Sequence, residues 1–99
     1  MPLTAGQRRY LRGLSHRRKV TVQMGRQGLV PTVVNELDTA LHAHELVKFR
    51  LVAGDRDGRD QVVRELCAAT GSELVQRIGN VATLYRRRSK EPAIILPAE

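Results

Sequence analysis

Positively charged side chains crowd the first third of this chain. Residues 1–35 hold seven Lys and Arg side chains and no Asp or Glu, and the whole chain carries a formal net charge of +7, so the remaining residues sum to zero. Clustered cations displace condensed counterions from a polyanion, so their position predicts a partner such as a nucleic acid. The alternative is a charge that only keeps the protein soluble, but such a charge has no reason to avoid the middle of the chain. The seven cations are Arg8, Arg9, Arg12, Arg17, Arg18, Lys19 and Arg26.

Two glycines enclose the last of these cations in the sequence Gly25-Arg26-Gln27-Gly28. Glycine allows positive φ angles and lets another molecule approach a backbone that has no Cβ. A helix is expected directly after the loop, and the free N–H groups at a helix start favour a bound anion. Such a loop can clamp a nucleic-acid backbone as the glycine loop of KH domains does, although that loop joins two helices whereas a strand precedes this one. Alone, the pattern is also typical of a plain turn; the surrounding cations favour the phosphate contact.

Three further cations extend the candidate surface. Lys48 and Arg50 alternate with apolar residues in a predicted strand, so they share its open face. A solvated sheet face and an RNA surface are both compatible with them. Arg86 begins a run of three arginines that can be an RNA contact or a soluble end. Because the chain has no Trp, one Phe and two Tyr, we expect it to recognise shape and backbone rather than stacked bases.

Motifs for catalysis or nucleotide binding are missing from the sequence. The P-loop needs GxxxxGK followed by Ser or Thr, and the dinucleotide fingerprint needs a third glycine; neither is present. The single cysteine, Cys67, excludes an internal disulfide and a multi-cysteine zinc site, and its apolar helix position predicts a buried small side chain. His42 and His44 do not share a helix face, so we expect no metal pair. The carboxylates near residue 57 alternate with arginines, which predicts a solvated turn and a helix N-cap. We therefore expect no enzyme, no metal and no cofactor.

Hydrophobic periodicity predicts three helices and four strands. Thr4 and Gln7 form a capping-box pattern that opens the first helix, whose arginines should point to solvent. Thr70-Gly71 ends the third helix, and Gly79-Asn80 is a hairpin signal between the last two strands. The predicted helices cover about residues 5–14, 31–43 and 59–69, and the predicted strands cover about 20–24, 45–52, 73–78 and 81–86. Residues 87–99 read as a tail that can dock on the body.

The order helix, strand, helix, strand, helix, strand, strand places the chain in the α/β class, as an α+β two-layer sandwich. Strands that alternate with helices favour parallel neighbours, and the final hairpin adds one antiparallel strand. Since two strands carry polar or basic residues opposite their apolar residues, we expect a four-stranded mixed sheet with helices on one side. One domain over residues 1–88 and a C-terminal tail over residues 89–99 suit a chain of 99 residues. We expect a monomer.

Targeting signals are also missing. No apolar stretch approaches the roughly 20 residues needed to span a bilayer, and the N-terminus lacks the apolar core of a secretory signal. A hydrophobic content of 41% distinguishes the chain from a disordered one. We therefore expect a cytoplasmic protein with no membrane partner.

A Gly-x-x-Gly-Leu sequence at residues 25–29 is followed, at a defined distance, by His44-Glu45-Leu46-Val47-Lys48. With this combination the chain resembles the YhbY-like RNA-binding proteins, which are single-copy versions of the CRM (chloroplast RNA splicing and ribosome maturation) domain. One departure is the sequence His16-Arg17-Arg18-Lys19-Val20 where the family has His-Pro-Leu-Lys-Pro, which makes this turn more basic and less rigid. The other matching stretches are Leu3-Thr4, Gln7-Arg8, Leu11 to Leu14, Glu36 to Leu41, Thr70-Gly71, Ile78-Gly79 and Leu84 to Arg86.

The resemblance implies a fold similar to the C-terminal domain of bacterial translation initiation factor three, preceded by an extra helix, with the last of four strands antiparallel to the rest. It also implies binding to ribosomal RNA of the large-subunit precursor through the GxxG loop and the basic surface beside it. We therefore expect an RNA-binding protein that assists ribosome assembly. The alternative is a protein-interaction module that docks on ribosomal or assembly proteins. The residues expected to contact RNA are Arg8, Arg9, Arg12, Arg17, Arg18, Lys19, Gly25, Arg26, Gln27, Gly28, Lys48, Arg50 and Arg86.

Overall fold

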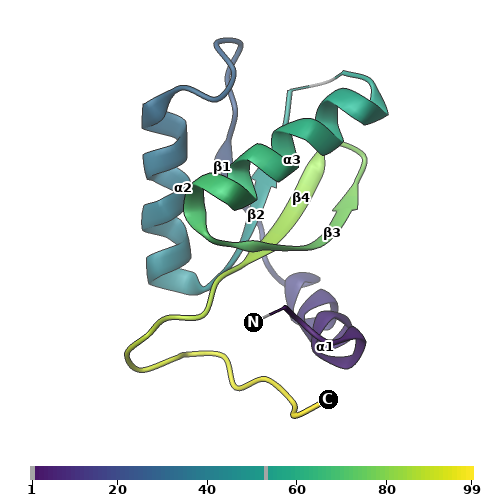
Figure 1. Ribbon diagram of the computed structural model, residues 1–99, viewed down its shortest axis with the longest axis vertical. Coiled ribbons are helices and arrows are strands. Elements are labelled where there is room, and N and C mark those ends of the chain that lie inside the picture. Colours follow the sequence, from purple (N-terminus) through teal and green to yellow (C-terminus); the bar gives the residue numbers. More distant parts are fainter. Residues whose placement is uncertain (1, 53) are drawn as a thin grey trace.

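The computed structural model describes residues 2–52 and 54–99 and contains the predicted order of elements (Figure 1). The helices are α1 (Ala5–Ser15), α2 (Pro31–His44) and α3 (Arg56–Thr70). The strands are β1 (Val20–Gln23), β2 (Leu46–Arg50), β3 (Glu73–Ile78) and β4 (Val81–Tyr85). No helix among the described residues is long and apolar enough to cross a bilayer.

Local sequence signals set most of the helix ends. The capping box of α1 is present, because the Thr4 hydroxyl accepts from the Gln7 N–H and the Gln7 side chain accepts from the Thr4 N–H, each at 3.0 Å. Helix α3 ends at Gly71, whose φ of 70° is left-handed and suits a residue without Cβ. That helix begins at Arg56, earlier than predicted, because the Asp55 side chain caps it by accepting from the Gly58 N–H at 2.7 Å.

The sheet has the strand order β1-β2-β4-β3. Strands β1 and β2 are parallel, and β4 is antiparallel to both of its neighbours, β2 and β3. The mixed four-stranded sheet and its terminal hairpin are therefore confirmed. In the described sheet, β1 and β2 are parallel neighbours as expected. The strands β2 and β3 are not neighbours, because β4 lies between them.

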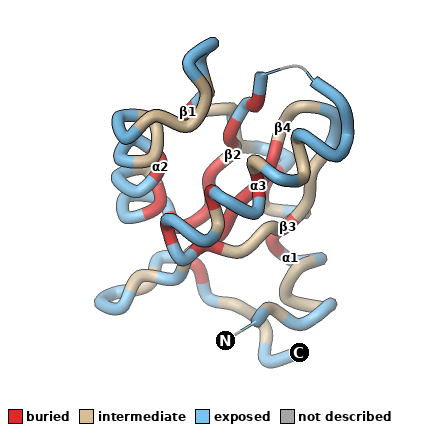
Figure 2. The backbone as a smooth tube through the Cα atoms, turned by 45° about the horizontal axis from the view of Figure 1, so that its top comes forward, coloured by how far each residue is buried: buried red, intermediate tan, exposed pale blue. Residues whose placement is uncertain are grey.

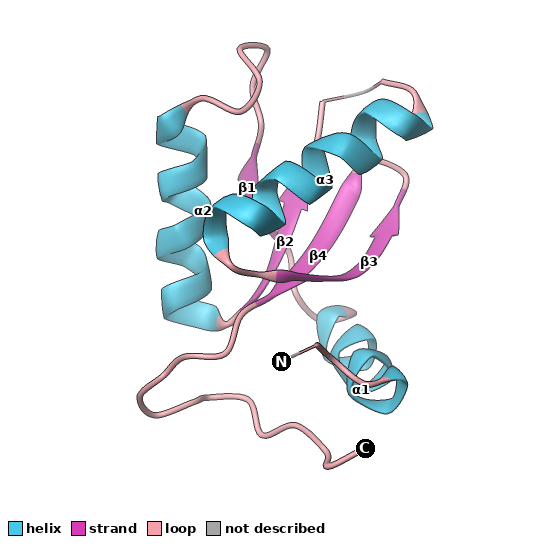
Figure 3. Ribbon diagram, in the orientation of Figure 1, coloured by secondary structure: helices cyan, strands magenta, loops and turns pink. Residues whose placement is uncertain are grey.

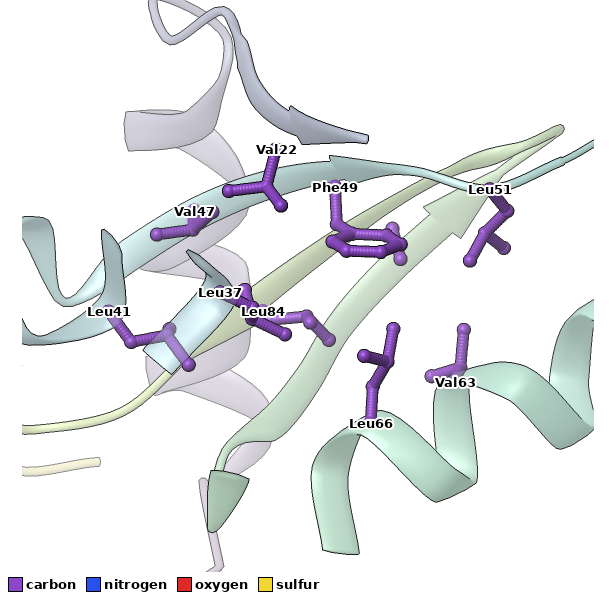
Figure 4. Packing of buried hydrophobic residues seen from close by; sticks show 10 residues of the cluster. Val22, Leu37, Leu41, Val47, Phe49, Leu51, Val63, Leu66 and Leu84 are labelled. Carbon is purple, nitrogen blue, oxygen red and sulfur yellow. The ribbon is translucent and has the colours of Figure 1, made fainter. Parts of the chain in front are cut away.

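One face of the sheet carries the main hydrophobic core. Figures 1 and 3 show α2 and α3 lying across this face, and Figure 4 shows the buried side chains that they enclose with the strands. Phe49 of β2, Leu37 of α2 and Leu66 of α3 are each 0% exposed. Burying one side chain of this size stabilises the fold by roughly 1.5–3 kcal/mol. This cluster fixes α2, and α2 in turn fixes the glycine loop that precedes it.

The opposite face is covered at one end only, by α1 and the C-terminal tail. Leu46 faces away from its neighbour Val47 and packs in a second cluster with Leu11 of α1, Tyr85 of β4 and Ile94 of the tail. Figure 1 shows α1 (purple) and the tail (yellow) at the same end of the sheet. The prediction that the helices lie on one side of the sheet is therefore correct for α2 and α3, whereas α1 packs on the other face. The predicted docking of the tail is confirmed.

Candidate nucleic-acid interface

The glycine loop is a tight, exposed turn. The Gly28 N–H donates to the Gly25 carbonyl at 3.1 Å, which places Arg26 and Gln27 at the exposed tip. Gly28 has a φ of 79°, a conformation that side chains rarely adopt. A Cβ built on either glycine would meet no described atom within 4 Å. The turn therefore needs glycine at 28 for its backbone, while the space around both glycines is open to another molecule. Figure 2 shows the exposed loop projecting from the sheet.

Helix α2 starts just behind this loop without a side-chain cap. Its N-cap residue is Val30, which makes no side-chain hydrogen bond with any described residue, and Pro31 opens the first turn. The N-terminal end of a helix carries a partial positive charge. Pro31 has no N–H and the Val33 N–H donates to the Val30 carbonyl at 3.0 Å, so among the first three helical positions only the Thr32 N–H has no partner in the described chain. Exposed Arg26 adds a full charge near this end. The loop and helix start together favour an anion.

The C-terminal end of α2, in contrast, is closed by the chain itself. The Leu41 carbonyl accepts from the Glu45 N–H at 2.8 Å. Arg88 reaches the His42 and Ala43 carbonyls, each at 3.4 Å, and Arg18 reaches the His44 carbonyl at 3.3 Å. All four terminal carbonyls thus have a donor, and two cations sit at the negative end of the helix.

Glu45 organises this closed end and is fully buried at 0% exposed. Its carboxylate accepts from three backbone N–H groups of the tail, those of Arg88 and Ala93 at 2.8 Å and of Ile94 at 2.7 Å. Burial disfavours the charged form, but these donors and the Arg88 charge hold the pKa of Glu45 below its ordinary value of 4.5. The sequence places Glu45 at the start of the strand predicted over about residues 45–52. Its φ of 64° and its tail contacts are long-range results that no local pattern signals.

Three of the predicted RNA-contacting cations are bonded within the protein. Arg8 donates to the Leu74 carbonyl at 3.3 Å, which corrects the expectation that all the arginines of α1 point to solvent. Arg18 donates to the Leu46 carbonyl at 3.0 Å as well as to that of His44. Arg86 donates to the Asp38 carboxylate of α2 and, at 2.8 Å, to the Thr70 carbonyl at the end of α3. These bonds tie elements together, so the donor groups that make them are less available to phosphates.

The other predicted cations remain available. Within residues 2–52 and 54–99, their side chains make no hydrogen bond or ion pair with the protein. Arg9, Arg17, Lys19, Arg26 and Arg50 are exposed, and Arg12 and Lys48 are half-buried. Lys48 and Arg50 lie on the face opposite the core residue Phe49, as predicted.

Strand β1 connects the two most basic parts of this set. It lies at the edge of the sheet, with the turn at residues 16–19 before it and the glycine loop after it. Figure 1 shows the loop at the far end of β1 from α1. Gly25 lies six positions after Lys19, which corresponds to about 20 Å of extended chain. The available cations Arg17, Lys19 and Arg26 therefore lie along one edge of the molecule rather than at one point.

Two side chains that could stack on a base or act as a nucleophile, Tyr85 and Cys67, lie partly or fully in the interior. Tyr85 is 5% exposed and packs in the cluster under α1, so its ring is not presented to a base, and burial raises the pKa of its phenol. Cys67 is half-buried against the main core, and burial raises the pKa of its thiol. The described residues contain no group of three His, Cys, Asp or Glu side chains that could hold a metal ion.

The family model of the CRS1 / YhbY (CRM) domain matches residues 3–86 of this chain. The chain belongs to this family. A Pseudomonas aeruginosa protein named "Probable RNA-binding protein" is 39% identical over 91% of this chain and 86% of its own length. A Haemophilus influenzae protein named "RNA-binding protein" is 35% identical and covers 96% of this chain and 95% of its own length.

The fold of this CRM domain is also that of a solved relative. The solution structure of a Staphylococcus aureus protein superposes with a TM-score of 0.84 at 34% identity, covering 97% of this chain and all of the other. That protein is described as "a putative RNA binding protein". The predicted family and the predicted fold are therefore confirmed.

Proposed function

We propose that this CRM-domain protein binds ribosomal RNA of the large-subunit precursor and assists ribosome assembly without catalysing a reaction. The observation that carries the proposal is the uncapped start of α2 behind an open glycine loop, joined along β1 to cations that the protein does not use itself. An anionic backbone is the ligand that satisfies all of these groups at once. The expected partner is RNA, with the protein acting as a cytoplasmic monomer.

The contacts divide by their chemistry. Arg17, Lys19 and Arg26 supply charge to phosphates, and the glycines let a backbone approach the tip of the loop. Lys48 and Arg50 extend the contact across the open sheet face. Because the described aromatic rings are buried or isolated, phosphate position and RNA shape contribute most of the recognition.

Support for RNA comes from the relatives, whose names describe RNA-binding proteins. Support for ribosomal RNA comes from the resemblance in the GxxG-Leu and His-Glu-Leu-Val-Lys stretches. Crosslinking in cells, followed by sequencing of the attached RNA, tests the ribosomal partner, and recovery of messenger or transfer RNA instead would overturn it.

Salt titration of binding to large-subunit ribosomal RNA fragments tests the interface. Each phosphate contact adds about 0.7–0.9 to the slope of log affinity against log salt. Arg17→Glu and Arg26→Glu should each lower that slope by about one and weaken binding, with unchanged melting temperatures. Arg64→Glu on α3 is the matched control, since it makes the same charge change on another element. A slope near zero for the unmodified protein would instead favour the protein-interaction module.

A further inference from the structure

A hollow of about 520 Å³ opens between the end of α1, the basic turn and the start of β2. Its volume lies within the range of sites that hold a small organic molecule, about 300–1,000 Å³. It is continuous with the basic edge, because Thr21 of β1 also borders it. The residues that matter for its chemistry are Leu14, Arg17, Arg18, Lys19, His44 and Leu46.

Arg18 lines the hollow, and the protein holds its guanidinium group in place. Arg18 Nη1 donates to the Leu46 carbonyl at 3.0 Å and to the His44 carbonyl at 3.3 Å. Two carbonyls on one edge restrict rotation of the planar group. A fixed guanidinium plane can stack on a nucleobase, as an aromatic ring does. Arg18 therefore supplies the flat surface that the buried rings Phe49 and Tyr85 do not.

The rest of the hollow combines apolar and cationic groups. Leu14 is half-buried, and with the edge of Leu46, which is 2% exposed, it forms a small apolar floor, whereas the Val47 side chain packs in the main core on the other face. Arg17 and Lys19 are exposed at the rim, and within the described chain neither side chain has a partner. An apolar floor suits the faces and edges of a base, whereas the rim suits the phosphates on either side of it.

We propose that this hollow receives one unpaired nucleotide of the bound RNA, with its base stacked on Arg18 and its flanking phosphates at Arg17 and Lys19. The inference rests on the proposed RNA-binding function and deepens it, because the protein then recognises a bulged or looped-out position rather than a uniform duplex. Charge complementarity selects a nucleotide over an apolar peptide side chain, which would leave both rim cations unpaired.

The test compares two RNA hairpins that are identical except for one unpaired nucleotide. Stacking of one base should make binding of the bulged hairpin about tenfold tighter. Arg18→Lys keeps the charge and removes the plane, so it should abolish this preference while retaining most of the affinity for the plain hairpin. Arg17→Lys is the matched control, and it should keep the preference.

A second measurement needs no variant and therefore does not depend on the folding of Arg18→Lys. A fluorescent 2-aminopurine at the unpaired position should become shielded from acrylamide quenching when the unmodified protein binds. Equal affinity for both hairpins, together with an unshielded 2-aminopurine, would overturn the nucleotide site and leave the proposed function standing. Failure to bind either hairpin would overturn both.

Discussion

The two ends of helix α2 differ in the hydrogen-bond partners that the rest of the chain supplies to them. At the C-terminal end, Arg18, Arg88 and the Glu45 N–H supply donors to the last carbonyls, and Glu45 holds the tail against the fold. At the N-terminal end, Val30 contributes no side-chain cap from among the described residues, and the glycine loop is open. The protein therefore places its own cations at the negative end of the helix, and the proposed function assigns the positive end to RNA.

This difference shows that the number of Lys and Arg residues in a segment overstates how many of them are free to bind a ligand. Arg17-Arg18-Lys19 and Arg86-Arg87-Arg88 look alike in the sequence. In the structure, Arg86 and Arg88 are bonded to α2, and the exposed members Arg17 and Lys19 lie beside β1. A basic run is thus a candidate contact only after its intramolecular bonds are known.

Glu45→Ala should have the largest effect, because it breaks the closed end. Three backbone N–H groups of the tail would lose their shared acceptor, and each buried unsatisfied donor costs about 1–3 kcal/mol. We expect a loss of at least about 3 kcal/mol in the free energy of unfolding, measured by urea denaturation. A loss below about 1 kcal/mol would show that the tail does not depend on this carboxylate.

Lowering the pH should weaken the contacts between Glu45 and the tail in the unmodified protein. Since the pKa of Glu45 is below 4.5 in the folded state, its charge stabilises the fold fully above that value. This contribution is lost as the pH falls through the folded-state pKa. Urea midpoints measured at decreasing pH should therefore converge for the unmodified protein and Glu45→Gln. A constant difference between them through the acid range would contradict the assignment.

Arg86→Ala separates a structural cation from a surface one. Loss of its bonds to Asp38 and to the Thr70 carbonyl should reduce stability by about 1–2 kcal/mol. Arg87→Ala, the exposed neighbour, should change stability by less than about 0.5 kcal/mol. Thermal unfolding of both variants provides the measurement. Equal shifts in the two variants would remove the distinction between the arginines.

Alanine substitutions at Gly25 and Gly28 test whether the open loop before α2 contacts RNA. Gly28→Ala should cost about 1 kcal/mol because its φ of 79° is unfavourable for a residue with Cβ. Gly25→Ala should leave stability unchanged, since that glycine has no positive φ and its Cβ would meet no described atom. Both should weaken RNA binding if a backbone approaches the loop. Unchanged affinity for Gly25→Ala would place the RNA elsewhere.

Local rules predicted much of this fold from the sequence. The capping box at Thr4, the stop at Gly71 and the hairpin at Gly79 each depend on neighbouring residues, so the sequence displays them directly. Alternation in β2 likewise separated Lys48 and Arg50 from the core. The predicted start of α3 at about residue 59 is too late, since the helix begins at Arg56 and Gly58 lies in its first turn.

The remaining features depend on contacts between distant residues. Arg8 meets Leu74, Arg86 meets Asp38 and the tail meets Glu45, and none of these pairs has a local signature. The placement of α1 on the second face likewise follows from the docked tail, whose Ile94 completes the cluster. The sequence could therefore identify the cations, but only the fold shows which of them are free.

The position of β4 has a consequence for how the chain matures. This strand is synthesised after the other three, yet it pairs with both β2 and β3 in the interior of the sheet. Before residues 81–85 leave the ribosome, those two strands have no common partner, and the exposed edges of nascent strands favour aggregation. The complete four-stranded sheet therefore cannot form until nearly the whole chain is available. A chain truncated before Val81 would lack the strand that joins β2 to β3. We expect such a chain to be degraded rather than to fold with reduced stability.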